Sequence, residues 1–324
     1  MNQSDWKRML AAGAVWAAVN GAIIPCGTAA EGGARPLALG GAYVGVAEDV
    51  HAVTWNPAGI AVLENTELTY SGTLTKREQP VLNDFVSDDY AAVAHPLYFG
   101  DRRGEPWAVM GLFFLNSRGE TPPSEVQVYQ AGFSLGKKIA ENISAGISVV
   151  FYRFGLDIQN ASESEDVITA NLGLLWDVSD WMSVGIVVEN ITEPNLEFFG
   201  VENKMVRNVK PGVALYPVDN LMITCDIYDA LGATKDKSAD FSQDIRVGCE
   251  YYLAKFLAVR GGAHHLFSAV DQSVYYSAGI GLQRAEFFRM YPITYYLDYA
   301  FLYWPDAAAG TEETVHNLSL SFKF

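Results

Sequence analysis

The chain ends in a stretch whose apolar and polar residues alternate strictly. Apolar side chains occupy every second position of residues 316–324 (Leu318, Leu320, Phe322 and Phe324), and polar ones lie between them (Asn317, Ser319, Ser321 and Lys323). Period-2 alternation places all the apolar side chains on one face of a β-strand. We expect this to be a closing strand whose apolar face contacts lipid. The alternative is an ordinary last strand of a soluble sandwich.

The same plan repeats from Thr66 onward, with an alternating run of about ten residues followed by a break. The expected strands are 66–74, 90–99, 107–115, 127–135, 143–152, 168–178, 182–189, 209–216, 221–228, 245–253, 257–264, 274–283, 293–301 and 315–324. Strands of this length and an even count of about 14 are typical of a tilted, antiparallel membrane barrel. The pattern therefore predicts an all-β fold, a transmembrane β-barrel of about 14 antiparallel strands.

The breaks between these strands alternate in length. The first, third and later odd breaks are long, as in 190–208 and 229–244, whereas most even breaks are short, as in 179–181. Only 284–292 is longer than this plan predicts. Outer-membrane barrels combine tight periplasmic turns with longer external loops, and a soluble sandwich has no reason to keep that asymmetry.

Charged residues collect on the face opposite the apolar one, and this face is expected to line the barrel. They include Asp226, Arg246, Glu250, Arg260 and Asp298. Such charges either line a solute path or form a structural network between the barrel and a plug. Alternation alone leaves open the inverse arrangement, in which the charged face is outside.

Three places depart from the regular pattern. After Phe151 the apolar phase shifts by one position, which predicts a bulge or the membrane boundary. Residues 109–115 are almost continuously apolar, which predicts that their inner face packs against a plug. Pro96 and Pro211 fall within expected strands, where a missing donor weakens the ladder and suggests a lateral gap.

The first thirty residues have the features of a secretory signal peptide. Lys7 and Arg8 precede an apolar run over residues 9–24, and small residues follow at 27–30. An uncleaved anchor is the alternative. The expected organisation is a signal peptide over 1–30, an N-terminal hatch segment over 31–64 and a barrel over 65–324. The formal charge of -16 argues against a nucleic-acid partner, because phosphate contacts need clustered Lys and Arg.

Two Gly- and Ala-rich motifs follow the signal peptide, GARPLALGGAYVGVAED at 33–49 and AVTWNPAG at 52–59. Together they resemble the N-terminal signature of the FadL-like outer-membrane proteins, most closely its PorV/PorQ-like branch, with Leu39 in place of the usual Met. The resemblance implies a 14-stranded barrel plugged by an N-terminal hatch. Its hatch motif comprises Gly40, Gly41, Asn56, Pro57 and Ala58.

The last strand also resembles the C-terminal targeting strand of bacterial outer-membrane barrels. By that resemblance Phe322 and Phe324 form the assembly signal that the barrel-assembly machinery reads. The expected location is the outer membrane of a Gram-negative cell, with membrane lipid around the barrel.

The resemblance implies two functions, and a third stays open. FadL-like members pass hydrophobic molecules such as fatty acids or hydrocarbons across the outer membrane, here by diffusion through a hatch-gated barrel. PorV-like members are partners of a protein-secretion apparatus, with a binding role rather than transport. The third interpretation is a structural surface protein without transport. An apolar pocket between hatch and wall is the feature that transport predicts.

No catalytic constellation, cofactor motif or metal site stands out, so we expect no enzyme. His264 and His265 are adjacent, and on a strand adjacent residues face opposite sides, which would prevent shared chelation of one metal. Cys225 and Cys249 lie on neighbouring expected strands, on the lipid side. We expect two free thiols, with a disulfide as the alternative.

Overall fold

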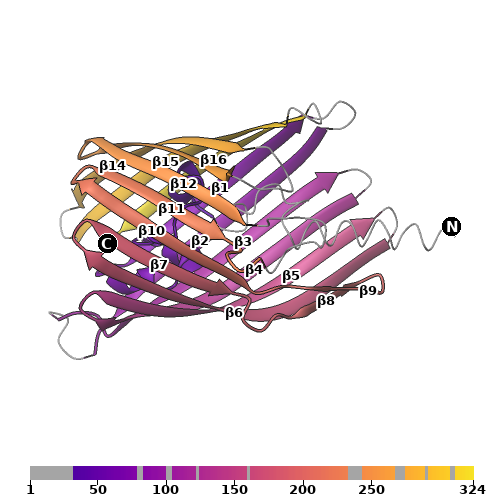
Figure 1. Cartoon of the computed structure of the whole chain (residues 1–324), viewed down its shortest axis with the longest axis horizontal. Helices are drawn as coiled ribbons and strands as arrows, with labels where there is room; N and C mark the ends of the chain where they lie inside the picture. Colours follow the sequence, from indigo (N-terminus) through magenta and orange to yellow (C-terminus); the bar gives the residue numbers. More distant parts are fainter. Residues whose placement is uncertain are drawn as a thin grey trace.

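The fold is a closed β-barrel of 14 antiparallel strands (Figure 1). The computed structural model describes residues 32–78, 83–99, 104–121, 124–158, 161–232, 243–266, 274–288, 291–306 and 311–324. The expected signal peptide lies outside the described residues. Each barrel strand pairs with its neighbours in sequence order, and β16 closes the barrel against β1.

The barrel strands are β1 (Glu67–Glu78), β2 (Asn83–Leu97), β3 (Ala108–Thr121), β4 (Ser124–Ala140), β5 (Ile143–Ile158), β6 (Ala161–Ser179), β7 (Met182–Glu189), β10 (Asn208–Val218), β11 (Leu221–Tyr228), β12 (Asp244–Ala254), β13 (Leu257–Leu266), β14 (Tyr275–Phe288), β15 (Tyr291–Asp306) and β16 (Thr311–Lys323). All 14 expected strands are confirmed, and β7 and β11 have the predicted bounds. A further hairpin, β8 (Asn195–Phe198) with β9 (Val201–Lys204), lies in the connection between β7 and β10 and was not predicted.

Several breaks that the pattern predicted are strand in the structure. β3 continues to Thr121 and pairs there with Ser124 of β4, and β5 and β6 pair up to Ile158 and Ala161. The expected break at 284–292 is also wrong, because β14 and β15 pair as far as Phe288 and Tyr291. Outside the membrane both faces of a strand can be polar, so alternation ends although the backbone hydrogen bonds continue. The long breaks in the alternation are therefore in large part strand extensions rather than loops.

The two faces of the wall are as predicted. The outward face exposes large apolar side chains, among them Leu68, Ile168 and Leu318, and the expected inner charges are buried. Asp226 is 0% exposed and Arg260 9%. An apolar exterior around a polar interior is the arrangement of a membrane-spanning barrel and the inverse of a soluble one. Cys225 and Cys249 are both free.

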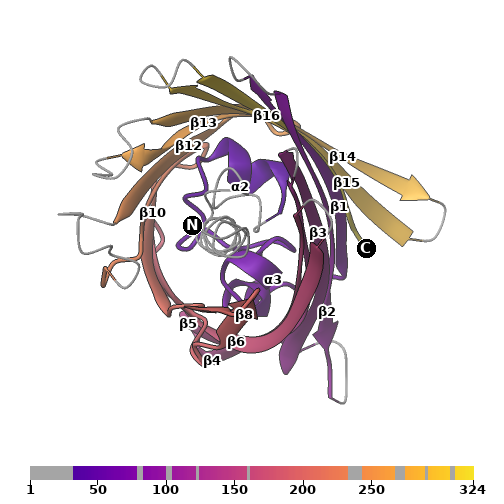
Figure 2. The same ribbon diagram turned by 90° about the vertical axis from the view of Figure 1, so that its right-hand side faces the viewer.

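The start of the described chain fills the barrel. Residues 32–64, here called the plug segment, contain α2 (Ala34–Ala38), α3 (Ala52–Trp55) and the 3₁₀ turn η1 (Gly59–Val62), and lie inside the ring of strands (Figure 2). Trp55 and Tyr43 pack edge to face within a buried apolar cluster that includes Val109 and Phe113 of β3. The prediction that β3 packs against a plug is confirmed. Within the described residues, no helix has the length and apolarity needed to cross a membrane.

The outer half of the barrel, at the end away from the short turns, has an uneven rim. β6 pairs with β7 only from Leu172, opposite Val188, so residues 161–171 extend beyond β7. The β8–β9 hairpin lies beside this extension (Figure 1). Leu196 and Phe198 of β8 are buried in a second apolar cluster with Phe154 and Leu156 of β5.

The bulge expected after Phe151 is therefore wrong. Pairing of β5 with β4 and β6 runs through residues 151–158 without a shift in register. Phe154 and Leu156 share the inward face with Val150, and both are buried. The change of apolar phase marks a point where the inner wall itself becomes apolar.

Candidate functional site

The Asn56-Pro57-Ala58 motif anchors the plug segment to the wall. The Asn56 side-chain amide donates hydrogen bonds to the carbonyl oxygens of Val44 (2.9 Å) and of Leu174 in β6 (3.2 Å). Its Oδ1 accepts the backbone N–H of Ala58 at 3.1 Å. One buried amide thus joins two parts of the plug to a barrel strand, and its polar atoms have partners, as burial requires.

Inward-facing glycines of the wall admit the plug backbone at this point. A Cβ at Gly146 of β5 would lie 2.2 Å from the Pro57 carbonyl carbon. One at Gly173 would lie 2.2 Å from Asn56 Oδ1, and one at Gly185 would lie 2.2 Å from the Val44 carbonyl oxygen. Any larger side chain at these positions would occupy the space of the plug. The glycines are visible in the sequence, but only the structure shows that they lie against the plug at the Asn56-Pro57-Ala58 motif.

Gly40 and Gly41 form a turn against another part of the wall, at β12 and β13. Their φ angles are +66° and +73°, a region that favours glycine. Gly40 also approaches β12 and β13 closely, because a Cβ there would lie 2.7 Å from the Ala263 backbone nitrogen. The Tyr228 hydroxyl donates to the Gly41 carbonyl oxygen at 3.2 Å. All five predicted hatch-motif residues are therefore at contacts between plug and wall.

A chain of alternating charges links the plug to the barrel. Arg35 of α2 donates to both carboxylate oxygens of Glu250, at 2.8 and 3.1 Å. Arg260 donates from Nε to Glu250 and from Nη1 to Asp298, each at 2.5 Å. Three of the predicted inner charges thus form one connected set with Arg35, a residue the sequence analysis did not single out. Its place in the Gly-Ala-Arg motif was the available signal.

Asp226 holds a different part of the plug. Its Oδ2 accepts the backbone N–H groups of Tyr43 (2.7 Å) and Val44 (2.8 Å). Arg246, the fifth predicted charge, instead donates to Asp244 at 2.7 Å, and its guanidinium lies 3.4 Å from the centre of the Tyr228 ring. These contacts favour a structural network at these residues, which the sequence left open beside a solute path.

Further polar groups of the plug complete the network around Arg35. Asp49 accepts hydrogen bonds from Arg35 (3.0 Å), from the Tyr43 hydroxyl (2.7 Å) and from the backbone of His51 (2.9 Å). Burial opposes ionisation of Asp49, but His51 and Arg35 outweigh it and lower the pKa of this carboxyl far below its usual value. Burial also opposes the charge of Arg35, yet the surrounding groups, Glu250 foremost, raise its pKa.

A cavity of about 200 Å³ lies between the plug and the wall near the short turns. Most of its lining residues are polar or charged, and they include Arg35, Asp49, Glu67, Tyr296 and Lys323. This cavity is therefore not the wholly apolar pocket that transport predicts at this boundary. A second apolar cluster inside the barrel, separate from the one around the plug, lies in the outer half between β8 and the inward face of β4–β6.

The proposed lateral gap beside a proline loses its support. Pro96 is in register with Val109 of β3, and Pro211 is in register with Ile186 of β7. The barrel is closed around its whole circumference.

The last residues close the barrel. Phe324 exchanges two backbone hydrogen bonds with Thr66, both at 3.0 Å, and its side chain is exposed. The role of Phe322 and Phe324 as an assembly signal stays a prediction.

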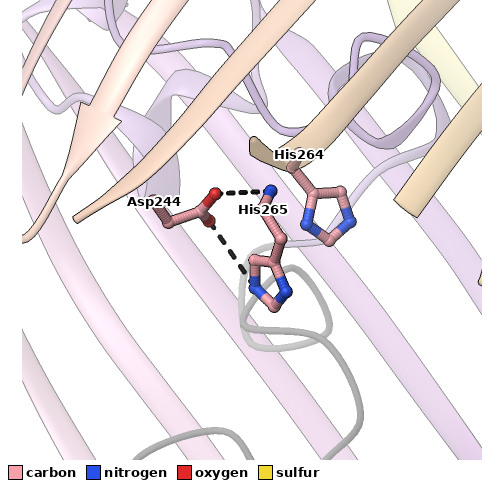
Figure 3. A group of neighbouring side chains, drawn as sticks. All are labelled: Asp244, His264 and His265. Atoms are coloured by element: carbon pink, nitrogen blue, oxygen red, sulfur yellow. Dashed lines mark hydrogen bonds and ion pairs between the residues drawn. The ribbon is translucent and has the colours of Figure 1, made fainter. Parts of the chain in front are cut away.

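The interpretation of His264 and His265 was wrong in its geometry. His265 has a φ of +60°, so the strand alternation fails there, and both imidazoles lie beside Asp244 of β12 (Figure 3). One potential ligand atom from each residue lies within 4.8 Å of the other two. This is the one such group of three or more metal-ligand side chains among the described residues.

Comparison with known proteins identifies the fold. No family model matches the sequence, and no curated protein sequence matches it. Solved structures do match over nearly the whole chain. They include the CymD monoaromatic hydrocarbon channel (12% identity, TM-score 0.67, 90% of this chain and 96% of CymD). A Pseudomonas aeruginosa FadL homologue has 13% identity and a TM-score of 0.59 over 91% of this chain and 97% of its own.

The Pseudomonas putida toluene transporter TodX is also similar, with 11% identity and a TM-score of 0.61 over 91% of this chain and 98% of TodX. The resemblance to FadL-like barrels is thus confirmed at the level of the fold. Nothing in these matches singles out the PorV/PorQ-like branch.

Proposed function

We propose that this protein is an outer-membrane channel for small hydrophobic molecules of the fatty-acid or hydrocarbon class. They would diffuse without an energy source from the cell exterior through the barrel, as the plug segment shifts. The observation that carries the proposal is the apolar lining of the outer half. Val126 and Val128 of β4, Phe154 of β5 and Val167 of β6 turn buried apolar side chains inward, facing Phe198 of the β8–β9 hairpin.

The apolar lining of this part of the interior also favours an apolar solute over a polar one. A water-filled pore for polar solutes needs a polar lining, whereas an apolar surface in a barrel interior favours apolar ligands. Barrels of the same fold are described as a toluene transporter and a monoaromatic hydrocarbon channel. The polar cavity beside Arg35 and Asp49 lies at the other end of the plug and would accept the solute only after the plug moves.

The proposal is tested by uptake. The full chain is expressed in a Gram-negative host that lacks its own FadL-like channel, and entry of a labelled long-chain fatty acid and of toluene is measured. We expect faster entry of at least one of them than in cells with an empty vector. Solvent extraction of the purified protein should also release a bound lipid-like molecule, which mass spectrometry detects.

A matched pair of variants ties uptake to the apolar lining. Val128→Asp places a charge in the outer apolar cluster and should bring uptake near the empty-vector level, whereas Val128→Ile should retain it. The amount of each variant in the outer membrane is compared first. Equal uptake with and without the protein would reject transport, and co-purification with secretion components would favour the PorV-like alternative.

A further inference from the structure

Asp244, His264 and His265 meet on the inner side of the wall, where β12 begins and β13 ends. His264 is fully buried, and its ring stacks on Tyr275 with centroids 4.4 Å apart and an interplanar angle of 11°. His265 is half-buried, and its ring lies edge-on to that of His264, with centroids 4.9 Å apart. Figure 3 shows the carboxylate of Asp244 directed at His265, with the His264 ring alongside.

The backbone of His265 is held in an unusual conformation by this cluster itself. Its positive φ is uncommon for a residue other than glycine, and such outliers gather at functional sites. The backbone N–H of His265 donates to Asp244 Oδ1 at 2.6 Å, and its ring Nε2 lies 3.7 Å from Asp244 Oδ2. One carboxylate thus fixes both the turn and the position of the second imidazole.

We propose that Asp244, His264 and His265 bind one divalent transition-metal ion of the Zn²⁺ class. Two imidazoles and a carboxylate are ligands that Zn²⁺ and Cu²⁺ accept. A tetrahedral site with bonds of about 2.0–2.1 Å places its ligands roughly 3.3 Å apart. The present spread of up to 4.8 Å would have to shorten by about 1.5 Å for all three atoms to bind one ion. Three protein ligands leave the fourth position to water or to a bound molecule.

Arg246 sets the strength of this site. Its Nε donates to Asp244 Oδ2 at 2.7 Å, which orients the carboxylate but also places a positive charge beside the metal. Asp226, which lies opposite Arg246 in the register of β11 and β12, partly offsets that charge. The cost of a neighbouring cation should make the site weaker than a structural zinc site, and removing the cation should strengthen it.

The test uses the full-length protein, purified in detergent with a tag that contains no histidine and stripped with a chelator. Zn²⁺ is titrated in competition with a chromophoric chelator, and Cu²⁺ is added separately for electron paramagnetic resonance. We expect one ion per chain and a copper spectrum with splitting from two nitrogens.

Three variants separate ligation from general effects of mutation. His265→Gln should weaken Zn²⁺ binding at least tenfold and reduce the copper spectrum to one nitrogen. Arg246→Gln should tighten binding, a direction that loss of structure would not produce. The control His316→Gln removes an exposed histidine of β16 that contacts Tyr299 and should bind as the wild type does.

Heat-dependent mobility on gels verifies that each variant is a folded barrel. Absence of stoichiometric binding by the wild type would overturn the proposal, and so would a His265→Gln variant that binds equally well. Loss of as much Zn²⁺ affinity in the control His316→Gln as in His265→Gln would also overturn the proposal. None of these outcomes depends on whether the barrel transports a hydrophobic solute.

Discussion

The two halves of the barrel interior are built from different contacts. Around the plug, buried charges pair with one another and with backbone groups, as in the Arg35–Glu250 pair and the Asp226 contacts to Tyr43 and Val44. In the outer half the inward face of β4–β6 is apolar and contacts a short hairpin, and the Lys204–Glu193 ion pair of the β7–β10 connection is partly exposed. The plug end thus combines directional bonds with apolar packing around Trp55 and Tyr43, whereas the β8–β9 hairpin contacts the wall mainly through non-directional apolar packing.

This difference has a consequence for transport. Directional, buried contacts are costly to break one at a time, so a plug held by them moves as a unit or not at all. Apolar contacts between the β8–β9 hairpin and the wall can be exchanged for contacts with an apolar solute at little cost. Under the proposed function, the outer half would be the site of solute entry, and the plug contacts would determine passage.

The largest effect is expected from Glu250→Gln. Glu250 is 2% exposed and accepts hydrogen bonds from Arg35 and Arg260. Loss of its charge leaves two buried guanidinium groups facing each other, and breaking a buried ion pair in this way costs about 3–5 kcal/mol. The free energy of unfolding, measured with urea in detergent, should fall by that amount. Combining it with Arg35→Met should cost less than the sum of the two single changes, and strict additivity would show that the pair is not coupled.

A smaller but still large loss should follow Gly146→Ala. The added Cβ would lie within 2.4 Å of backbone atoms of Pro57 and Ala58, which cannot rotate away as a side chain could. Overpacking of this kind costs about 1–3 kcal/mol, and displacement of the plug should raise ion conductance across a planar bilayer.

Gly155→Ala is the matched control for this substitution. It lies on the same strand, and a Cβ there meets nothing closer than 3.7 Å. It should leave both stability and conductance unchanged. Equal behaviour of the two variants would mean that the plug does not rest on the wall at Gly146.

Alternation predicts strand bounds well only where one face of the strand meets the membrane and the other does not. β7 and β11 were predicted to the residue because each is short, alternates throughout and begins at a tight turn. The outer parts of β3 and β6 were missed because their polar residues give no alternation, although the ladder of hydrogen bonds continues. The shift in apolar phase after Phe151 predicts a bulge or the membrane boundary, and an apolar interior was not among these interpretations.

The alternation of apolar and polar positions could not predict which residues of the plug contact which residues of the wall. The sequence identified Asp226, Glu250 and the Asn56 motif as candidates, but Arg35 and Glu250 are 215 positions apart. Only the closed barrel and the plug bring them together. The histidine pair was misjudged because a single positive φ at His265 is not visible in the alternation.

An intermediate effect that depends on pH is expected from Asp49→Asn. Because the folded state lowers the pKa of Asp49, its ionised form stabilises the plug above the unfolded pKa of about 3.9, and that stability is lost as the pH falls through the lower, folded pKa. The difference from wild type should be about 1–2 kcal/mol and constant between about pH 5 and 8. It should shrink as the pH falls below about 4.

Urea unfolding at a series of pH values measures this difference. The control is Asp180→Asn in the exposed turn between β6 and β7, which should match the wild type at every pH. A difference that grows on acidification would contradict the lowered pKa of Asp49.

The smallest effect is expected where the same chemical change is made in the outer half. Glu193 accepts hydrogen bonds from Lys204 Nζ at 3.1 Å and from the backbone of Arg207 at 3.3 Å, but the Lys204 side chain is 50% exposed. Water already solvates both partners of such a pair, so replacing the carboxylate leaves no buried charge behind. Glu193→Gln should unfold at the same urea concentration as the wild type.

High salt sharpens the contrast between Glu193→Gln and Glu250→Gln. At 1 M salt the screening length is about 3 Å, so any residual effect at the partly exposed Glu193 should vanish, whereas the loss at the buried Glu250 should persist. A loss at Glu193 as large as that at Glu250 would mean that the β7–β10 connection is held as firmly as the plug. The contrast between the plug, held by buried ion pairs, and the β8–β9 hairpin, held by apolar contacts, would then be wrong. Both regions would resist solute entry equally.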